Sequence, residues 1–159
     1  MAVARRSLVF PSTAAWETTL AGPVLSLLRI VAGFLFACHG AQALFGAFGG
    51  VPGFPGGVPA GNWPIWWAGV IEFVAGGLVL LGLFTRLAAV LCSGTMAYAY
   101  FTVHLPAGLW PLENFGEMAA LNAWVFLLIA VLGPGPWSLD AMLHRLRGPS
   151  SPTDSAATP

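Results

Sequence analysis

The sequence predicts an all-α membrane protein: a four-transmembrane-helix bundle with a short C-terminal interfacial helix. Of the 159 residues, 57% are hydrophobic and only 8% are charged, whereas a soluble domain carries about 25% charged residues. Four apolar stretches are long enough to cross a bilayer as helices. The arginines that flank these stretches also fall on one side of the predicted membrane. The length fits a single domain.

The four apolar stretches are expected to be helical, because a segment in lipid must satisfy its own backbone hydrogen bonds. Each has 18 to 22 residues, and about 20 residues of helix cross the roughly 30 Å of hydrocarbon. The predicted spans are Val24–Phe45, Pro64–Phe84, Leu87–His104 and Phe115–Leu132.

A short amphipathic segment follows the fourth span. Residues 133–136 read Gly-Pro-Gly-Pro, which ends a helix. Ser138 is then a candidate N-cap. The apolar residues of 138–147 recur at helical spacing opposite His144 and two arginines, so we expect a helix lying on the membrane surface. The membrane domain would comprise residues 1–147, and the polar tail 148–159 is predicted to be disordered.

The arginine pattern predicts the orientation of the chain. The flanking arginines all fall on one side of a four-span topology, and the two opposite loops contain no Arg or Lys. Both termini are therefore expected on the cytoplasmic side of the cell membrane. The Gly- and Pro-rich loop 46–62 would lie on the outer side, where tryptophans at its end suit an interfacial belt. The flanking arginines are Arg5, Arg6, Arg86, Arg145 and Arg147.

The sequence excludes several function classes. The net charge is zero and Lys is absent, so no basic patch indicates nucleic acid as a partner. Common catalytic and nucleotide-binding motifs are missing, and the catalytic residues, if any, stay unknown. Cys38 and Cys92 lie in different predicted helices at different depths, and we expect no disulfide between them.

Two charged residues lie inside predicted spans. A charge at membrane depth costs about 2.5–3.5 kcal/mol by insertion scales and is retained when it is paired or functional. Glu72 is flanked on its face by Ala68, Gly69, Ala75 and Gly76, and small residues admit a neighbouring helix. Glu72 is thus expected to point into the bundle. Arg29 could either extend to the cytoplasmic headgroups or reach inward to Glu72.

Two histidines and a glutamate complete a candidate polar pocket in the outer half. His39 lies at the predicted depth of Glu72; such a pair could relay protons or hold a quinone headgroup, although a lone His is usually a hydrogen-bonded core residue. His104 would line the pocket, with Glu117 at its rim and Arg29 below. Glu117 ends a capping-box spacing that begins at Asn114, so a helix cap is favoured over a metal site, and no metal is predicted.

Several short motifs in order resemble the DoxX family of small four-helix membrane proteins. The resemblance runs from Leu28 to about Leu143. Gln42 departs from it, because a basic residue is expected after His-Gly. The motifs are an arginine early in the first span, His39-Gly40, Glu72 before a Gly-Gly pair, Gly82–Arg86, His104–Gly108, Asn114–Glu117 and Gly133–Asp140.

What the resemblance implies is a redox association. Members of the family are described as membrane components linked to quinone-dependent oxidation of sulfur compounds, or to complexes that handle oxidative and thiol stress. The expectation is a redox-associated subunit with quinone as a possible cofactor, other redox proteins of the membrane as partners, and a possible homo-oligomer. Two alternatives stay open: a non-enzymatic scaffold that recruits partner proteins, and a carrier of small solutes or protons.

Overall fold

The structure, a computed structural model, describes residues 13–147. The predicted all-α class is confirmed, and the described residues form no sheet. The third helix continues through a π-helical turn, Tyr100–His104, and a short 3-10 turn, Leu105–Ala107. The predicted tail, Arg5 and Arg6 lie outside the described residues. The α-helices are α1 (Thr13–Phe45), α2 (Ile65–Leu81), α3 (Thr85–Ala99), α4 (Glu117–Leu132) and α5 (Leu139–Leu146).

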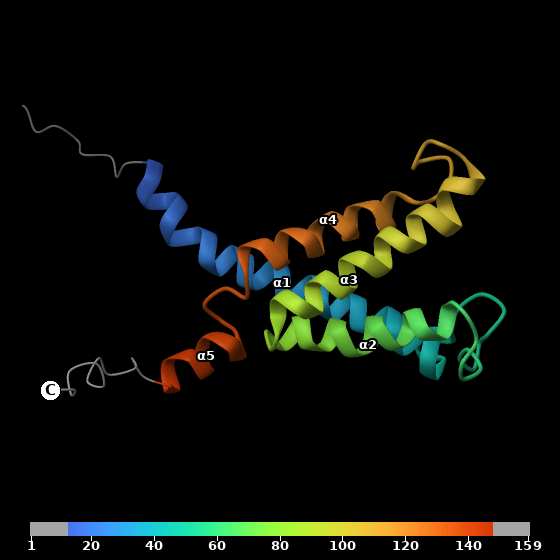
Figure 1. The fold of residues 1–159 in the computed structure, drawn as a ribbon, viewed down its shortest axis with the longest axis horizontal. Helices are drawn as coiled ribbons and strands as arrows, with labels where there is room; N and C mark the ends of the chain where they lie inside the picture. Colours follow the sequence, from blue (N-terminus) through green and yellow to red (C-terminus); the bar gives the residue numbers. More distant parts are fainter. Residues whose placement is uncertain (1–12, 148–159) are drawn as a thin grey trace, which may run out of the picture.

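The helices are arranged as two antiparallel pairs (Figure 1). α2 lies along α1 and α4 lies along α3, and a tight turn at residues 82–84 joins the pairs. We call the end of the bundle that holds this turn and α5 the α5 end. The opposite end, which holds residues 46–64 and the connection 105–116, is the loop end. α2 and α3 diverge from the turn toward the loop end.

Glycines allow α1 and α2 to pack with their backbones in close contact. A Cβ added at Gly76 would lie 2.8 Å from the Ala37 nitrogen, and one at Gly69 would lie 2.9 Å from the Cβ of Ala43. Small residues at such positions are typical of helix pairs in membranes. The prediction that the small residues around Glu72 admit a neighbouring helix is thus confirmed, and that helix is α1.

A small hydrophobic core holds all four long helices together. Phe36 of α1 and Phe126 of α4 contact each other with ring centroids 4.7 Å apart. Val79 of α2, Cys92 of α3 and Ile129 of α4 are fully buried around them. Cys38 and Cys92 are both free thiols, as the sequence predicted.

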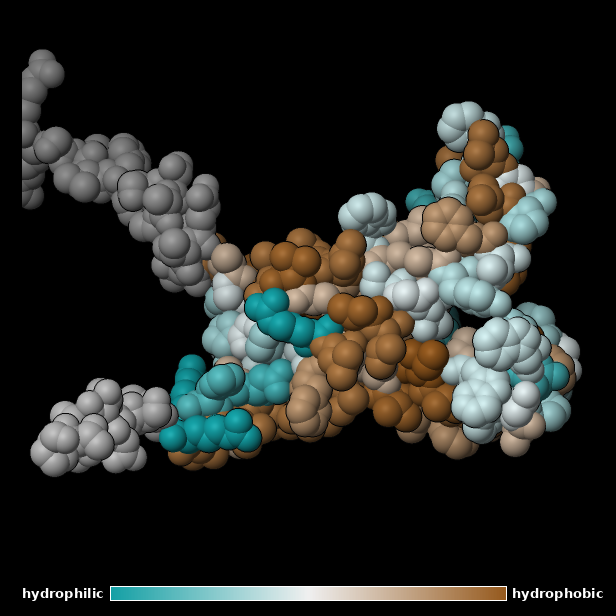
Figure 2. Space-filling view, in the orientation of Figure 1, coloured by the Kyte–Doolittle hydropathy of each residue, from teal (hydrophilic) through white to brown (hydrophobic). Residues whose placement is uncertain are grey.

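The outer surface of the bundle is apolar. Large hydrophobic side chains are exposed along all four long helices, and Figure 2 shows them as a hydrophobic band along the helices. Two helical stretches, Leu20–Phe45 and Thr85–Ala107, are long and apolar enough to cross a membrane, while α2 and α4 are shorter apolar helices. Such a surface is expected to face lipid rather than water.

Several predicted boundaries differ from the structure. α2 ends at Leu81 rather than Phe84, and α3 begins at Thr85 rather than Leu87. α1 begins at Thr13 rather than Val24 and continues through Pro23; the φ angle of proline suits a helix, and membrane helices tolerate the lost hydrogen bond. The stretch predicted as one helix over 87–104 changes to π-helical geometry at Tyr100. α4 begins at Glu117 rather than Phe115, because Phe115 has a left-handed φ of 57°.

Candidate functional site

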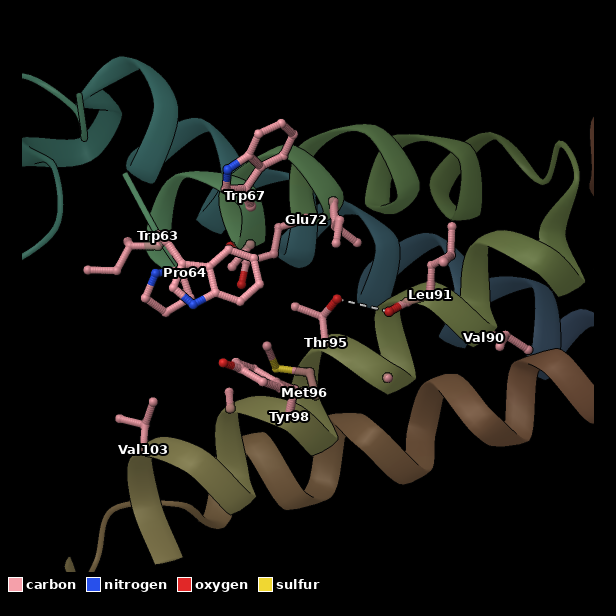
Figure 3. Close-up of a pocket in the computed structure, with 15 residues that line it drawn as sticks. Trp63, Pro64, Trp67, Glu72, Val90, Leu91, Thr95, Met96, Tyr98 and Val103 are labelled. Carbon is pink, nitrogen blue, oxygen red and sulfur yellow. Dashed lines mark hydrogen bonds between the residues drawn. The ribbon is translucent and has the colours of Figure 1, made fainter. Parts of the chain in front are cut away.

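A cleft of about 580 Å³ lies between α2 and α3, in the half of the bundle toward the loop end. Figure 3 shows the side chains that line it, from the start of α2 on one side and from α3 on the other. They are almost all apolar or aromatic. The lining residues are Trp63, Pro64, Ile65, Trp67, Ala68, Ile71, Glu72, Val90, Leu91, Gly94, Thr95, Met96, Tyr98, Ala99 and Val103.

The cleft exists because α2 and α3 separate and carry small residues where they face each other. The helices diverge from the turn at the α5 end (Figure 1). A Cβ added at Gly94 would meet no atom within 4 Å, which leaves the space beside α3 open. Toward the loop end the rings of Trp63 and Tyr98 approach edge to face, with centroids 6.3 Å apart. These two rings bridge the gap between the helices.

Glu72 is the one charged residue among the described side chains that line the cleft. It lies near the middle of α2 and is half-buried. In Figure 3 its carboxylate points toward Trp63. Every fully buried side-chain oxygen and nitrogen in the described part has a hydrogen-bond partner. No described residue donates a hydrogen bond to the Glu72 carboxylate or places an opposite charge near it. Its oxygens are therefore available to a ligand.

Few other polar groups of the described residues face the cleft, and apart from the indole N–H groups of Trp63 and Trp67 they are hydroxyls. The Thr95 hydroxyl already donates to the carbonyl oxygen of Leu91 at 2.9 Å. Tyr98 is nearly half exposed on the rim. Cys92 is fully buried behind the cleft and lies within electrostatic range of Glu72. The site thus combines one carboxylate with aromatic and aliphatic walls.

Of the five residues of the predicted polar pocket, only Glu72 lines the cleft. His39 is exposed on α1. His104 lies in the π-helical turn, where its Nδ1 is 3.0 Å from the carbonyl oxygen of Asn114. Glu117 is exposed at the first turn of α4. Within residues 13–147 no three His, Cys, Asp or Glu side chains gather as a metal site would require.

The predicted capping box at the start of α4 does not form. The N-cap is Gly116 and Glu117 is the first helical residue, so Asn114 lies two residues too early to be the cap. The side-chain oxygen of Asn114 instead accepts from the Gly116 amide at 2.7 Å, and its amide group donates to Gly108 at 2.7 Å. The left-handed φ of Phe115 favours this local turn over the box.

Arg29 follows neither of the two alternatives that the sequence left open. It is 1% exposed, so it does not extend to headgroups. Its guanidinium donates four hydrogen bonds of 2.5–2.9 Å to backbone carbonyls at the α5 end, rather than pairing with Glu72. The acceptors are Val79 and Leu80 near the end of α2, and Pro134 and Trp137 in the segment after α4. Arg29 therefore joins the end of α2, where helix carbonyls lack intrahelical donors, to the segment that connects α4 and α5.

Asp140 makes the reciprocal connection to α3. Its carboxylate accepts hydrogen bonds from the amides of Phe84 and Thr85 and from the Thr85 hydroxyl, at 2.9–3.0 Å. Partial burial raises the pKa of Asp140, but these hydrogen bonds and the nearby His144 outweigh that effect and hold the pKa below its usual value. A carboxylate at a helix N-terminus also complements the helix dipole.

Two further side chains complete this arrangement. Arg86 donates to the carbonyls of Ala130 and Val131 at the end of α4, at 2.8–2.9 Å. Ser138 accepts from the Ala141 amide at 3.1 Å, which confirms it as the N-cap of α5. We call Arg29, Arg86, Ser138 and Asp140 the α5-end network. Sequence reasoning missed it, although the motifs Gly82–Arg86 and Gly133–Asp140 contain three of its four residues.

Comparisons with known proteins agree with the sequence resemblance. The family model described as DoxX matches residues 24–105. An uncharacterized protein of Haemophilus influenzae is 40% identical over 119 residues, which cover 73% of this chain and 87% of that protein. An uncharacterized membrane protein of Mycobacterium tuberculosis is 34% identical over 142 residues, which cover 77% of this chain and 83% of that protein. No solved structure matches the chain significantly.

Proposed function

The chain belongs to the DoxX family, and we propose that it is a multi-pass membrane protein that binds an amphiphilic small molecule from the bilayer. The cleft between α2 and α3 would hold this molecule, and Glu72 would contact its polar part. The observation that carries the proposal is a carboxylate in an apolar cleft, with no hydrogen-bond or ion-pair partner among residues 13–147. An ionisable group kept at membrane depth indicates a functional site.

The dimensions and lining of the cleft support this proposal. Its volume of about 580 Å³ falls in the range of roughly 300–1,000 Å³ that is usual for small-molecule sites. Such sites combine apolar walls with a few polar groups that orient the ligand. Trp67, Leu91 and Val103 line the cleft and are also exposed on the apolar surface of the bundle, so a ligand would enter from the lipid.

The proposed topology has four spans and places both ends of the described chain, residues 13 and 147, on the cytoplasmic side. α2 and α4, with 17 and 16 residues, reach about 25 Å at 1.5 Å per residue, so residues beside them would complete the crossing. Arg86, Arg145 and Arg147 lie at the α5 end, which supports a cytoplasmic location for that end. The cleft would then open toward the outer leaflet.

A quinone is the ligand class that the family resemblance suggests, in a redox-associated subunit. The test is to purify the protein in mild detergent, extract bound small molecules and identify any quinone by mass spectrometry. Quinone-coupled reductase activity in membranes would be measured in parallel. We expect the Glu72→Gln variant to retain less ligand than the wild type, because a carboxylate accepts hydrogen bonds from the hydroxyl groups of a reduced quinone more strongly than an amide does.

The matched control is Glu117→Gln, the same chemical change at an exposed residue outside the cleft. It should retain ligand like the wild type. Loss of ligand in both variants would point to a general effect on the fold. Equal retention of ligand by wild type and Glu72→Gln would refute the role proposed for Glu72.

A second candidate function is a scaffold for partner proteins, and one observation favours it. The α5-end network fixes α5 against the bundle, while Met142, Leu143 and Leu146 remain exposed on it. Either lipid or a partner protein would cover this face. Pull-downs with wild type and with a variant in which these three residues are serine would distinguish the two, because a scaffold loses partners while a lipid-docked helix does not.

A further inference from the structure

We infer that the cleft between α2 and α3 accepts a lipophilic organic cation, such as an amine or a quaternary ammonium or phosphonium compound carried in the bilayer. This inference rests on the proposed function, because it specifies the ligand of the same cleft. It follows from the charge of the cleft, its aromatic walls and the hydrogen-bonding groups that remain available.

The one ionisable side chain among the described residues that line the cleft is an acid, and no described basic group compensates it. Glu72 alone among the described lining residues carries a charge. The two arginines of the long helices, Arg29 and Arg86, both have their guanidinium groups engaged with backbone carbonyls toward the α5 end. Lys is absent from the chain. A carboxylate in a low-dielectric environment is stabilised most by an opposite charge, and here the ligand would have to supply it.

The aromatic side chains around the carboxylate also favour a cation. Trp63, Trp67 and Tyr98 all line the cleft. In Figure 3 the Trp63 ring lies between Glu72 and Tyr98, while the Trp67 ring points away from α3. Aromatic faces attract cations within about 6 Å of the ring centroid, and tryptophan does so most strongly. Cages of aromatic rings are a common way of recognising quaternary ammonium groups. One carboxylate with two indoles and a phenol is thus a suitable set of groups for an organic cation.

The cleft offers few hydrogen-bond donors to a neutral ligand whose polar atoms are carbonyl oxygens. Its oxygens are acceptors, and so are both oxygens of an ionised Glu72. The Thr95 hydroxyl is already engaged with Leu91. The donors that remain are the Tyr98 hydroxyl and the two indole N–H groups at the rim. The polar centre of the cleft therefore selects for a positive charge over a carbonyl.

The experiment compares two compounds of similar size and shape. Tetraphenylphosphonium is a lipophilic cation, and triphenylphosphine oxide is its neutral counterpart with an acceptor oxygen. Binding to the purified full-length protein in detergent is measured by equilibrium dialysis of the labelled compounds. We expect the wild type to bind the cation at least about tenfold more tightly than the oxide, a ratio that one buried charge pair supplies.

Two substitutions separate the contribution of the charge from that of the fold. Glu72→Gln should weaken binding of the cation by about tenfold or more and leave binding of the oxide almost unchanged. Glu117→Gln, outside the cleft, should change neither. Trp63→Ala should weaken binding of the cation by a smaller factor of about 2–5, as a partly exposed cation–π contact would.

The outcomes separate this inference from the proposed function. If the oxide binds as tightly as the cation and depends on Glu72, the cleft is a ligand site but its preference for cations is refuted. If neither compound binds, nor displaces a ligand that co-purifies with the protein, the cation inference is overturned. Absence of any co-purified ligand or quinone binding would then count against the proposed function as well.

Discussion

Arg29 at the α5 end and Glu72 in the cleft are both ionisable residues within apolar helices, yet their surroundings differ completely. The guanidinium of Arg29 is 1% exposed and donates to four carbonyls that belong to two separate segments. The carboxylate of Glu72 has no such partner among the described residues and faces a cleft of about 580 Å³. The guanidinium of Arg29 stabilises the fold, whereas the carboxylate of Glu72 is available to a ligand.

The difference shows how to separate structural from functional polar groups in a small membrane protein. A buried charged group whose hydrogen bonds all go to backbone carbonyls stabilises the packing of the helices, because buried carbonyls without a donor are costly in a dry environment. A charge inside the bundle that faces open space has kept its binding capacity for another molecule. Substitutions at the α5 end should therefore change the stability of the protein, whereas substitutions in the cleft should change ligand binding.

The largest effect on stability is expected from Arg29→Met. Methionine fits a similar volume but leaves the carbonyls of Val79, Leu80, Pro134 and Trp137 without their donor. Each buried hydrogen-bonding group that is left unsatisfied costs about 1–3 kcal/mol, and several carbonyls lose their donor at once. Thermal unfolding in detergent would measure the loss. The same substitution at the exposed Arg147 is the control and should change stability little; an Arg29 variant as stable as that control would contradict the structural role.

The next effect concerns the contact between α1 and α2. Gly76→Ala places a Cβ 2.8 Å from the backbone nitrogen of Ala37, and overpacking of this kind costs about 1–3 kcal/mol. The neighbouring Gly77 has no atom within 4 Å of an added Cβ. Gly77→Ala should thus be neutral or slightly stabilising, since alanine favours a helix by about 1 kcal/mol over glycine. Equal unfolding temperatures for the two variants would show that the helices do not approach so closely.

A smaller effect is expected from Asp140→Asn. The substitution weakens three hydrogen bonds at the start of α3, and loss of a helix cap costs about 1 kcal/mol. The pKa of Asp140 is lower in the folded protein than its usual value. Its contribution to stability is therefore present at neutral pH and is lost as the pH falls through the folded-state pKa.

The measurement that checks this contribution is thermal unfolding of both proteins as a function of pH. The wild type should be more stable than Asp140→Asn at pH 7, and the gap should close below the usual aspartate pKa of about 3.9. A gap that persists unchanged in acid would mean that the carboxylate charge is not the source of the stabilisation.

The sequence predicted the helices well but the polar groups only in part. Long apolar stretches and the Gly-Pro-Gly-Pro stop depend on local chemistry, so α2, α4 and α5 lie within three residues of their predicted limits. The Ser138 cap was predictable for the same reason. The partners of Arg29 could not be predicted, because they are backbone carbonyls about 50 and 105 residues away. Every residue has a carbonyl, so residue type does not identify the acceptors.

The candidate site was predictable to the same limited extent. The cost of a charge in the membrane identified Glu72 correctly as unusual, and the small residues around it predicted a close helix neighbour. Matching depth also suggested His39 as its partner, but depth does not fix the direction of a side chain around a helix. His39 faces outward from α1, while the cleft is on the side of α2 that faces α3. The tryptophans in the walls of the cleft are those that the sequence predicts in an interfacial belt.

The smallest effect on stability, and the sharpest test of the comparison, is expected from Gly94→Leu. Gly94 lines the cleft, and an added Cβ would meet no atom within 4 Å, so a leucine there fills ligand space without displacing protein atoms. We expect unfolding to shift by no more than about 0.5 kcal/mol, while ligand binding falls about tenfold or more because the cleft is occupied. Gly77→Leu is the control: its site is equally open, but it does not line the cleft, so it should leave binding intact. If Gly94→Leu binds ligand like the wild type, the space between α2 and α3 is not the site, and the contrast between a satisfied arginine and an available glutamate would no longer separate structure from function.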